Sequence, residues 1–134
     1  MLTIGQVAAR TGLRASAIRY YEELGLLPKT IRQSGRRVYD ASVFDRLAVI
    51  DLAKTAGFEL RDIKLMVAAG DRPASAWQSL GKRRRAQIDQ DMKRLRLMKQ
   101  IVSEIDRCSC ATQSQCARQF AAAKAKYIGR RDNN

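Results

Sequence analysis

Three cysteines lie close together near the end of this 134-residue chain. Cys108 and Cys110 form a Cys-x-Cys pair, and five residues separate Cys110 from Cys116. Thiolates at this spacing can bind one soft metal ion or a metal cluster, whereas free thiols can be oxidised or alkylated by reactive molecules. The nearby Arg107 and Arg118 favour the thiolate forms. The cluster predicts a sensor site, against the alternative of three structural cysteines grouped by chance.

The rest of the composition argues against catalysis. The chain contains no histidine, so it lacks the commonest general base and the commonest metal ligand. It also has no glycine-rich phosphate-binding motif, and the three thiols have no partner base in their segment. We therefore expect a protein that is not an enzyme.

The net charge indicates the kind of partner. Lys and Arg number 26 against 13 Asp and Glu, which gives a formal charge of +13. Such an excess favours a polyanion, with nucleic acid the leading candidate and an anionic membrane surface the next.

The first residues do not resemble a signal peptide, and no window has the roughly 18 apolar residues of a membrane span. We expect a cytoplasmic protein without a membrane partner. In the cytoplasm thiols are normally kept reduced.

The first 40 residues predict a winged helix-turn-helix. Thr3 and Gln6 are spaced as a capping box, which starts a helix that stops at Gly12. A second helix is expected from Arg14 to Glu23. Residues 31–39 then place a Ser-Gly turn between extended basic segments, which predicts a short hairpin carrying three arginines. This order is typical of DNA-binding proteins, and the alternative is an ordinary helical hairpin.

Two more helices are expected before a chain break at residues 70–73. The helix over residues 41–56 should turn one apolar face inward, formed by Val43, Leu47, Ile50 and Leu52. The helix over residues 60–69 should do the same with Leu60, Ile63 and Val67.

A long helix is expected over residues 76–106, with a length of about 45 Å. Its apolar residues form a stripe that is too narrow for the core of a monomer, so a second helix should cover it as a coiled coil. The predicted dimer seam comprises Ile88, Met92, Leu95, Met98 and Val102, with Ile105 beside it. The tail from Ala117 predicts a short helix over the cysteine loop, anchored by Phe120 and Tyr127, and residues 130–134 are expected to be disordered.

The order of these parts resembles the MerR family of transcription regulators. The resemblance is carried by residues 3–8, by Thr11-Gly12-Leu13, by Ala17-Ile18-Arg19-Tyr20-Tyr21-Glu22 with Gly25-Leu26-Leu27, by residues 34–39 and by Ala56-Gly57-Phe58. It implies a mainly α fold: a winged helix-turn-helix DNA-binding domain with a long antiparallel coiled-coil dimerisation helix. The expected divisions are a DNA-binding domain (1–70), a linker and dimerisation helix (71–107), and a cysteine effector loop with the C-terminal tail (108–134).

The resemblance also implies a function. Such proteins bind double-stranded promoter DNA as homodimers alongside RNA polymerase, and they activate transcription by distorting the DNA when an effector binds. On the matching positions, the second helix should approach the major groove, and the wing and Lys64 should contact the DNA backbone. The expected DNA-binding residues are Arg14, Ser16, Arg19, Tyr20, Arg36, Arg37, Tyr39 and Lys64.

Within the family, the cysteine loop is most similar to SoxR-like redox sensors, which bind a 2Fe–2S cluster through Cys-x-x-Cys-x-Cys-x5-Cys. Three of the four positions match, but Ile105 stands at the first, and such a cluster normally takes four thiolates. Asp106, a group from the partner chain or an external thiol could substitute for the missing cysteine. The resemblance favours redox sensing through a cluster.

Two other effectors remain open within the family. The soft-metal sensors place two loop cysteines seven or eight residues apart, and some add a cysteine from the partner's long helix, where this chain has Trp77. Three thiolates could still bind a soft ion, or the thiols could sense oxidants without any cofactor. Trp77 itself either covers the partner's cysteine loop or simply packs the start of the long helix. An architectural DNA-binding protein without a sensor is the alternative of a different class.

Overall fold

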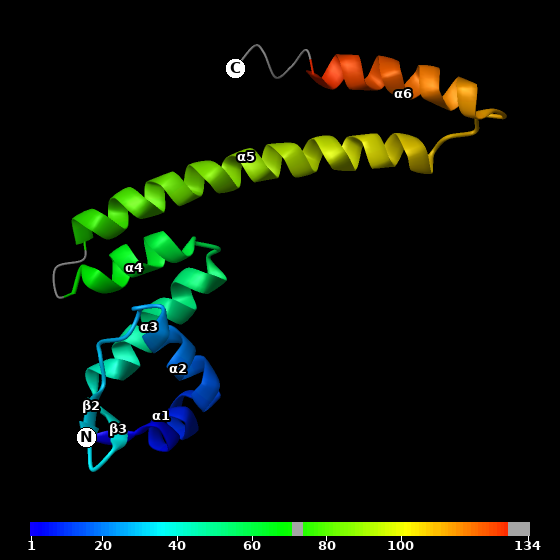
Figure 1. Ribbon diagram of the computed structural model, residues 1–134. Helices are drawn as coiled ribbons and strands as arrows, with labels where there is room; N and C mark the ends of the chain where they lie inside the picture. Colours follow the sequence, from blue (N-terminus) through cyan, green and yellow to red (C-terminus); the bar gives the residue numbers. More distant parts are fainter. Residues whose placement is uncertain (71–73, 129–134) are drawn as a thin grey trace. The chain divides into compact units, whose positions relative to one another are not determined.

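The computed structural model describes residues 1–70 and 74–128, and it divides into two compact units, Met1–Lys82 (unit 1) and Arg83–Asn134 (unit 2). The elements are β1 (Leu2–Thr3), α1 (Ile4–Thr11), α2 (Ala15–Glu23), β2 (Ile31–Gln33), β3 (Arg36–Tyr39), α3 (Ser42–Thr55), α4 (Leu60–Ala68), α5 (Ala74–Asp106) and α6 (Gln113–Ile128). Figure 1 labels all of them except β1. The predicted mainly helical class is confirmed. Among the described residues, no helix has the length and apolar character that crossing a membrane requires.

The predicted capping box starts α1. The backbone N–H of Gln6 donates to Thr3 Oγ1 at 3.3 Å, and the backbone N–H of Thr3 donates to Gln6 Oε1 at 2.9 Å. These two bonds satisfy amides that a helix end leaves without a partner. Gly12 then ends α1 with a φ of 72°, a left-handed conformation that glycine adopts without strain. The following helix, α2, is therefore free to turn away from α1.

The wing belongs to a three-stranded antiparallel sheet of order β1-β3-β2. Ile31, Arg32 and Gln33 of β2 pair with Val38, Arg37 and Arg36 of β3. The hairpin was predicted, whereas the short edge strand β1, which pairs Leu2 with Tyr39, was not. This extra pairing attaches the wing to the chain segment that enters α1.

The core of unit 1 is formed by the helix-turn-helix, the sheet, α3, α4 and the start of α5. Its largest fully buried side chains are Val7, Ile18, Leu26, Val43 and Ile50. Two predicted core positions are wrong, because Leu52 is 59% exposed and Leu60 is 40% exposed. Leu52 lies only two residues after Ile50, so helical geometry turns it to the opposite side and Ala53 faces inward instead. Leu60 is the first residue of α4, and Met66 is buried on that helix.

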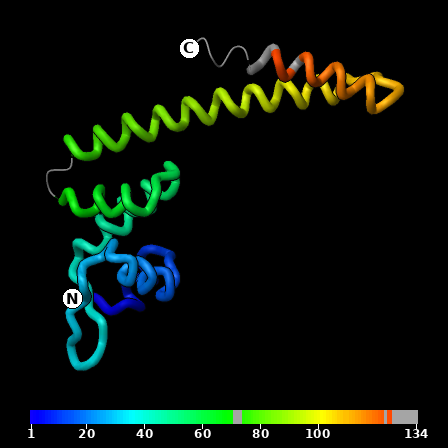
Figure 2. Tube along the Cα trace, turned by 45° about the horizontal axis from the view of Figure 1, so that its top comes forward, coloured from blue at the N-terminus to red at the C-terminus, as the bar shows by residue number. Residues whose placement is uncertain are grey.

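Unit 2 consists of most of α5, the loop that follows it, and α6. α5 runs without a break for 33 residues, which Figure 2 traces as one continuous helix. The predicted seam residues are among its exposed apolar side chains: Ile88 (38%), Met92 (44%), Leu95 (58%), Met98 (51%) and Val102 (59%). α6 begins at Gln113, four residues before the predicted tail helix. Residues 130–134, predicted to be disordered, lie outside the described residues.

Candidate nucleic-acid interface and cysteine site

A basic hollow lies on unit 1 where α2, the wing and the start of α1 meet. Its lining comprises Thr3, Ile4, Arg19, Arg32, Gly35, Arg36 and Arg37. Four guanidinium groups can donate several hydrogen bonds each in the planar geometry that phosphate oxygens accept. The adjacent N-terminus of α1 adds a favourable dipole. The chemistry of this hollow suits a nucleic-acid backbone.

The structure brings together three of the predicted DNA-binding residues, Arg19, Arg36 and Arg37, in this hollow. Sequence reasoning left out Arg32, although its opposition to Arg37 in the hairpin register places it in the same hollow. The remaining exposed candidates lie elsewhere on unit 1. They are Arg14 at the N-cap of α2, Ser16 and Tyr20 on α2, and Lys64 on α4.

Tyr39 is placed differently from the arginines. Only 4% of the residue is exposed, and its hydroxyl donates to Glu22 Oε2 at 3.2 Å. Burial, followed by the charge and hydrogen bond of Glu22, raises the pKa of Tyr39 to about 12. Its hydroxyl is therefore a donor at any physiological pH, and it is directed toward α2. This geometry favours a supporting role for Tyr39 over direct contact with phosphate.

Glu22, near the end of α2, accepts bonds from the wing and from Thr30, the residue that precedes β2. Its Oε1 accepts from the Thr30 hydroxyl, and its Oε2 lies 3.3 Å from Nε of Arg37. Burial raises the pKa of Glu22, but the hydrogen bonds from Thr30 and Tyr39 and the charge of Arg37 outweigh that effect, and the net pKa is lowered. Glu22 is consequently a carboxylate at neutral pH.

The three cysteines of unit 2 come together as their spacing predicted. Their Sγ atoms all lie within 4.8 Å of one another, and Sγ of Cys108 is 3.1 Å from Sγ of Cys116. Cys108 and Cys110 lie in the loop after α5, and Cys116 lies in the first turn of α6. The Thr112 hydroxyl accepts from the backbone N–H of Gln115 at 3.3 Å, which helps start α6 and returns Cys116 to the other two thiols.

Hydrogen bonds distinguish the Cys108 thiol from the Cys116 thiol. Bonds from the Cys110 and Cys116 thiols and from the backbone N–H of Cys110 lower the pKa of Cys108. The bond with Cys108, then that with Cys110, raises the pKa of Cys116 to about 12. Cys108 is therefore the first of this pair to ionise. Arg107, which was expected to favour thiolates, donates from Nε to the backbone oxygen of Ser103 at 3.2 Å.

The group of three thiols has no carboxylate or further cysteine beside it in the part of the chain that the structure describes. Among the described residues, no carboxylate oxygen lies with the three sulfurs within 4.8 Å of one another, and substitution of the fourth thiolate by Asp106 stays a prediction. Ile105, at the missing cysteine position, is 54% exposed at the end of α5. Among the described residues, the cysteine and carboxylate ligand atoms that lie together here are the three sulfurs.

Trp77 is held within unit 1. Its indole Nε1–H donates to the backbone oxygen of Met66 at 3.0 Å, and its ring packs against the core of unit 1. This contact supports the interpretation that Trp77 packs the start of the long helix. The alternative, that it covers a partner's cysteine loop, stays a prediction.

Comparisons with known proteins give matches along most of the chain. A family model described as "MerR HTH family regulatory protein" matches residues 2–70, and one described as "MerR, DNA binding" matches residues 44–105. The chain is 31% identical over 120 residues to the HTH-type transcriptional regulator CueR of Vibrio cholerae, covering 86% of each protein. It is 31% identical over 122 residues to an HTH-type transcriptional activator SoxR homolog of Chromobacterium violaceum, covering 86% of this chain and 80% of the relative.

A solved structure gives a similar result. The transcription regulator PbrR691 of Ralstonia metallidurans CH34, in complex with lead(II), superposes with a TM-score of 0.73 at 27% identity. The match covers 86% of this chain and 93% of that one. The likeness therefore includes the long helix as well as the helix-turn-helix and its wing.

Proposed function

This chain belongs to the MerR family of transcriptional regulators, and we propose that it binds promoter DNA as a homodimer and responds to a soft metal ion at Cys108, Cys110 and Cys116. The observation that carries the metal proposal is the set of three sulfurs within 4.8 Å of one another, with no further ligand in the group among the described residues. Thiolates select soft ions, and three of them suit a trigonal site. The similarity to a regulator in complex with lead(II) supports the same class of ligand.

The proposed DNA contact uses the basic hollow of unit 1. Arg19 would reach the major groove from α2, while Arg32, Arg36 and Arg37 would hold the phosphate backbone. Arg14, Ser16, Tyr20 and Lys64 would extend the contact over neighbouring positions. Because phosphate contacts fix the register of a protein on the duplex, the wing would determine how closely α2 approaches the bases.

The proposed dimer covers the exposed apolar stripe of α5. Six apolar side chains, from Ile88 to Ile105, are between 38% and 59% exposed in the single chain. A second copy in antiparallel pairing would bury this stripe as a coiled coil. Two DNA-binding units would then bind a two-fold promoter site, and a metal-dependent change in the dimer would distort that DNA beside RNA polymerase.

The test of the metal proposal is the metal content and spectrum of the full chain purified without air. Titration of the apoprotein with Cd²⁺ should saturate at one ion per three-cysteine site and give ultraviolet thiolate-to-metal absorption. Cys110→Ser should reduce that absorption and weaken binding, whereas the neighbouring Ser109→Ala should retain both. Three thiols that remain free in excess Cd²⁺ would overturn the proposal.

An iron–sulfur cluster is the second candidate, because the spacing of the three cysteines matches three of the four positions in SoxR-like sensors. The 31% identity to a SoxR homolog supports it. Iron, sulfide and absorbance between about 400 and 550 nm in protein purified without air would establish this candidate and displace the soft ion. Ile105→Cys would supply the fourth thiolate, so the variant should stabilise such a cluster if the loop can bind one.

A thiol sensor without a cofactor and an architectural DNA-binding protein are the other outcomes. Colourless, metal-free protein whose promoter activity responds to oxidants would establish the thiol sensor. Promoter activity that Cys110→Ser leaves unchanged, across oxidants and soft metals alike, would establish the architectural protein.

A further inference from the structure

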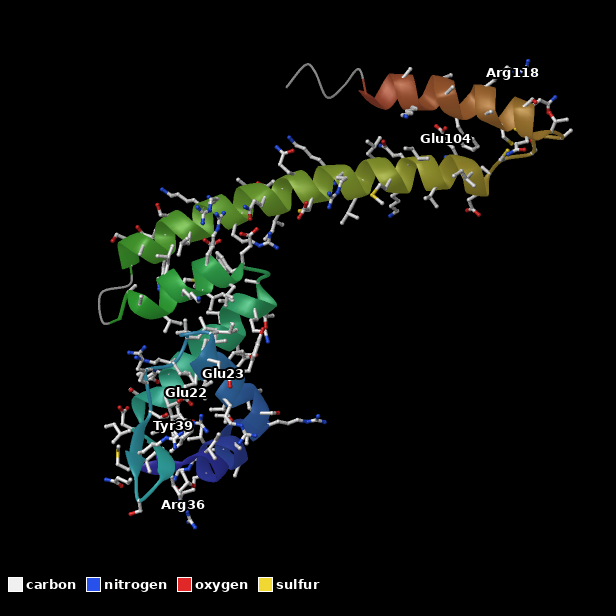
Figure 3. The ribbon with its side chains drawn as sticks, in the orientation of Figure 1. Glu22, Glu23, Arg36, Tyr39, Glu104 and Arg118 are labelled. Atoms are coloured by element: carbon white, nitrogen blue, oxygen red, sulfur yellow. The ribbon has the colours of Figure 1, made fainter. Side chains whose placement is uncertain are left out.

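A carboxylate at the end of α2 links this helix to the wing. We call α2 the recognition helix, because it is the helix expected to approach the major groove. The side chain of Glu22 is 15% exposed, and its ion-pair partner Arg37 is 34% exposed. Thr30 and Tyr39 donate hydrogen bonds to the same carboxylate. These three partners are eight to seventeen residues away in sequence, so the contact is tertiary and joins elements that would otherwise move separately. Figure 3 labels Glu22 on α2 and Tyr39 on β3.

The wing needs such a carboxylate because its register opposes like charges. Arg32 lies directly across the hairpin from Arg37, and like charges in this position repel. Arg19 and Arg36 line the same hollow. Before DNA supplies phosphates, the carboxylate of Glu22 is therefore a counter-charge for the wing, and it determines where the Arg37 guanidinium lies.

We propose that Glu22 is a positioning residue for DNA recognition: through its ion pair with Nε of Arg37, it fixes the wing's phosphate contact relative to Arg19 on the recognition helix. A phosphate contact held at a fixed distance from the base-reading side chains accepts DNA in one register. A guanidinium without this restraint still attracts phosphate, but equally well in many registers. Glu22 thus contributes to discrimination between DNA sequences rather than to total affinity. The inference rests on the proposed DNA-binding function.

The experiment measures binding of the full chain to two duplexes by fluorescence anisotropy. One duplex is selected from a random pool by the wild-type protein, and the other has the same composition in shuffled order. Glu22→Gln keeps the shape of the side chain and one acceptor oxygen, but it replaces the other oxygen by a donating amide and removes the charge that holds Arg37. We expect the ratio of the two Kd values to fall by about tenfold.

The matched control is Glu23→Gln, on the adjacent residue. Glu23 is exposed, so its variant changes the net charge by the same amount without altering the Glu22 contact. Both variants should bind the shuffled duplex slightly more tightly, since each removes one negative charge. Only Glu22→Gln should lower the ratio of the two Kd values.

A double-mutant cycle tests whether Glu22 acts through Arg37. Arg37→Ala alone should weaken binding to both duplexes, and adding Glu22→Gln should then change the ratio no further. A lowered ratio that persists in the Arg37→Ala background would overturn the proposal, as would equal ratios for Glu22→Gln and Glu23→Gln. If Glu22→Gln fails to fold, Tyr39→Phe removes one bond to the carboxylate and should lower the ratio by a smaller factor, and an unchanged ratio would overturn the proposal.

Failure of the inference is distinguishable from failure of the proposed function. Wild-type protein that selects no duplex from the pool would contradict DNA recognition itself. Wild-type protein that discriminates between the duplexes, with discrimination unaffected by Glu22→Gln, would contradict only the role of Glu22.

Discussion

The arginines of unit 1 and the cysteines of unit 2 are held by different kinds of contact. In unit 1, residues distant in sequence fix the basic hollow: Glu22 bonds to Thr30, Arg37 and Tyr39 above a buried core. In unit 2, the cysteine group is held by contacts within a segment of about a dozen residues, among them Cys108 with Cys116 and Cys110 with Gln119. All three cysteines are partly exposed.

The difference indicates how each region responds to its ligand. A surface supported by a core is already arranged before binding, so its substitutions should change affinity or selectivity in small steps. A loop held by local bonds gains its order from the ligand, so removal of one ligand atom should remove the response altogether.

Cys110→Ser should remove the metal response while leaving DNA binding intact. Loss of one of three thiolates should weaken soft-ion affinity by about 100-fold or more. Competition with a chelating dye measures this loss, and anisotropy with the selected duplex measures DNA binding of the apoprotein. Ser109→Ala is the control. A variant that loses DNA binding together with metal binding would contradict the independence of the two regions.

Leu95→Glu should weaken the dimer. Leu95 is 58% exposed in the single chain, and a second copy would bury a charge at this position, at a cost of at least about 100-fold in dimer affinity. Sedimentation velocity measures the change. Gln90→Glu introduces the same charge on the opposite face of α5 and should leave the dimer unchanged. Equal behaviour of the two variants would place the dimer contact elsewhere.

Arg32→Ala should weaken DNA binding modestly and for all sequences alike. If Arg32 neutralises one phosphate, the slope of log K against log salt should fall in magnitude by about 0.9. Titrations of the selected and shuffled duplexes between low and moderate salt measure both slopes. An unchanged slope would remove Arg32 from the backbone contact, even though it lines the hollow with Arg36 and Arg37.

The smallest expected effect is a pH dependence of stability. The pKa of Glu22 is lowered in the folded chain from its ordinary value of 4.5. Its contribution to stability is therefore fully present above that ordinary value and is lost as the pH falls below it, through the lowered pKa. Thermal unfolding from pH 7 to pH 3 should show a shallower decline for Glu22→Gln than for Glu23→Gln. Parallel declines would show that Glu22 carries no linked stability.

Local signals in the sequence predicted much of unit 1. Thr3 and Gln6 located the start of α1, and the Ser-Gly pair located the wing, because caps and turns depend on residues close in sequence. The same kind of signal at Thr112 and Gln115 marks the start of α6, but it was missed, and the tail helix was placed four residues too late. Leu52 was wrongly assigned to the core because the prediction followed its apolar side chain and ignored its angular position on the helix.

In the candidate sites too, contacts between residues close in sequence could be predicted, whereas contacts between distant residues could not. The proximity of Cys108, Cys110 and Cys116 follows from their spacing, so the sequence could predict it. The role of Glu22 could not be predicted, because its partners reach it only after the sheet packs against α2. Nor could sequence predict the burial of Tyr39, which its pairing with Leu2 and its bond to Glu22 produce. The stripe on α5 predicts a partner helix, because its apolar side chains are exposed in the single chain.

The hydrogen bond from Trp77 to Met66 gives the protein an intrinsic fluorescent probe at a defined place. Trp77 is the only tryptophan in the chain, so its emission arises from one place, the junction between α4 and the start of α5. Indole emission shifts to longer wavelength when the ring becomes hydrated. Intrinsic fluorescence during Cd²⁺ titration would therefore show, without any attached dye, whether an event at the cysteine loop is transmitted along α5 to the DNA-binding unit.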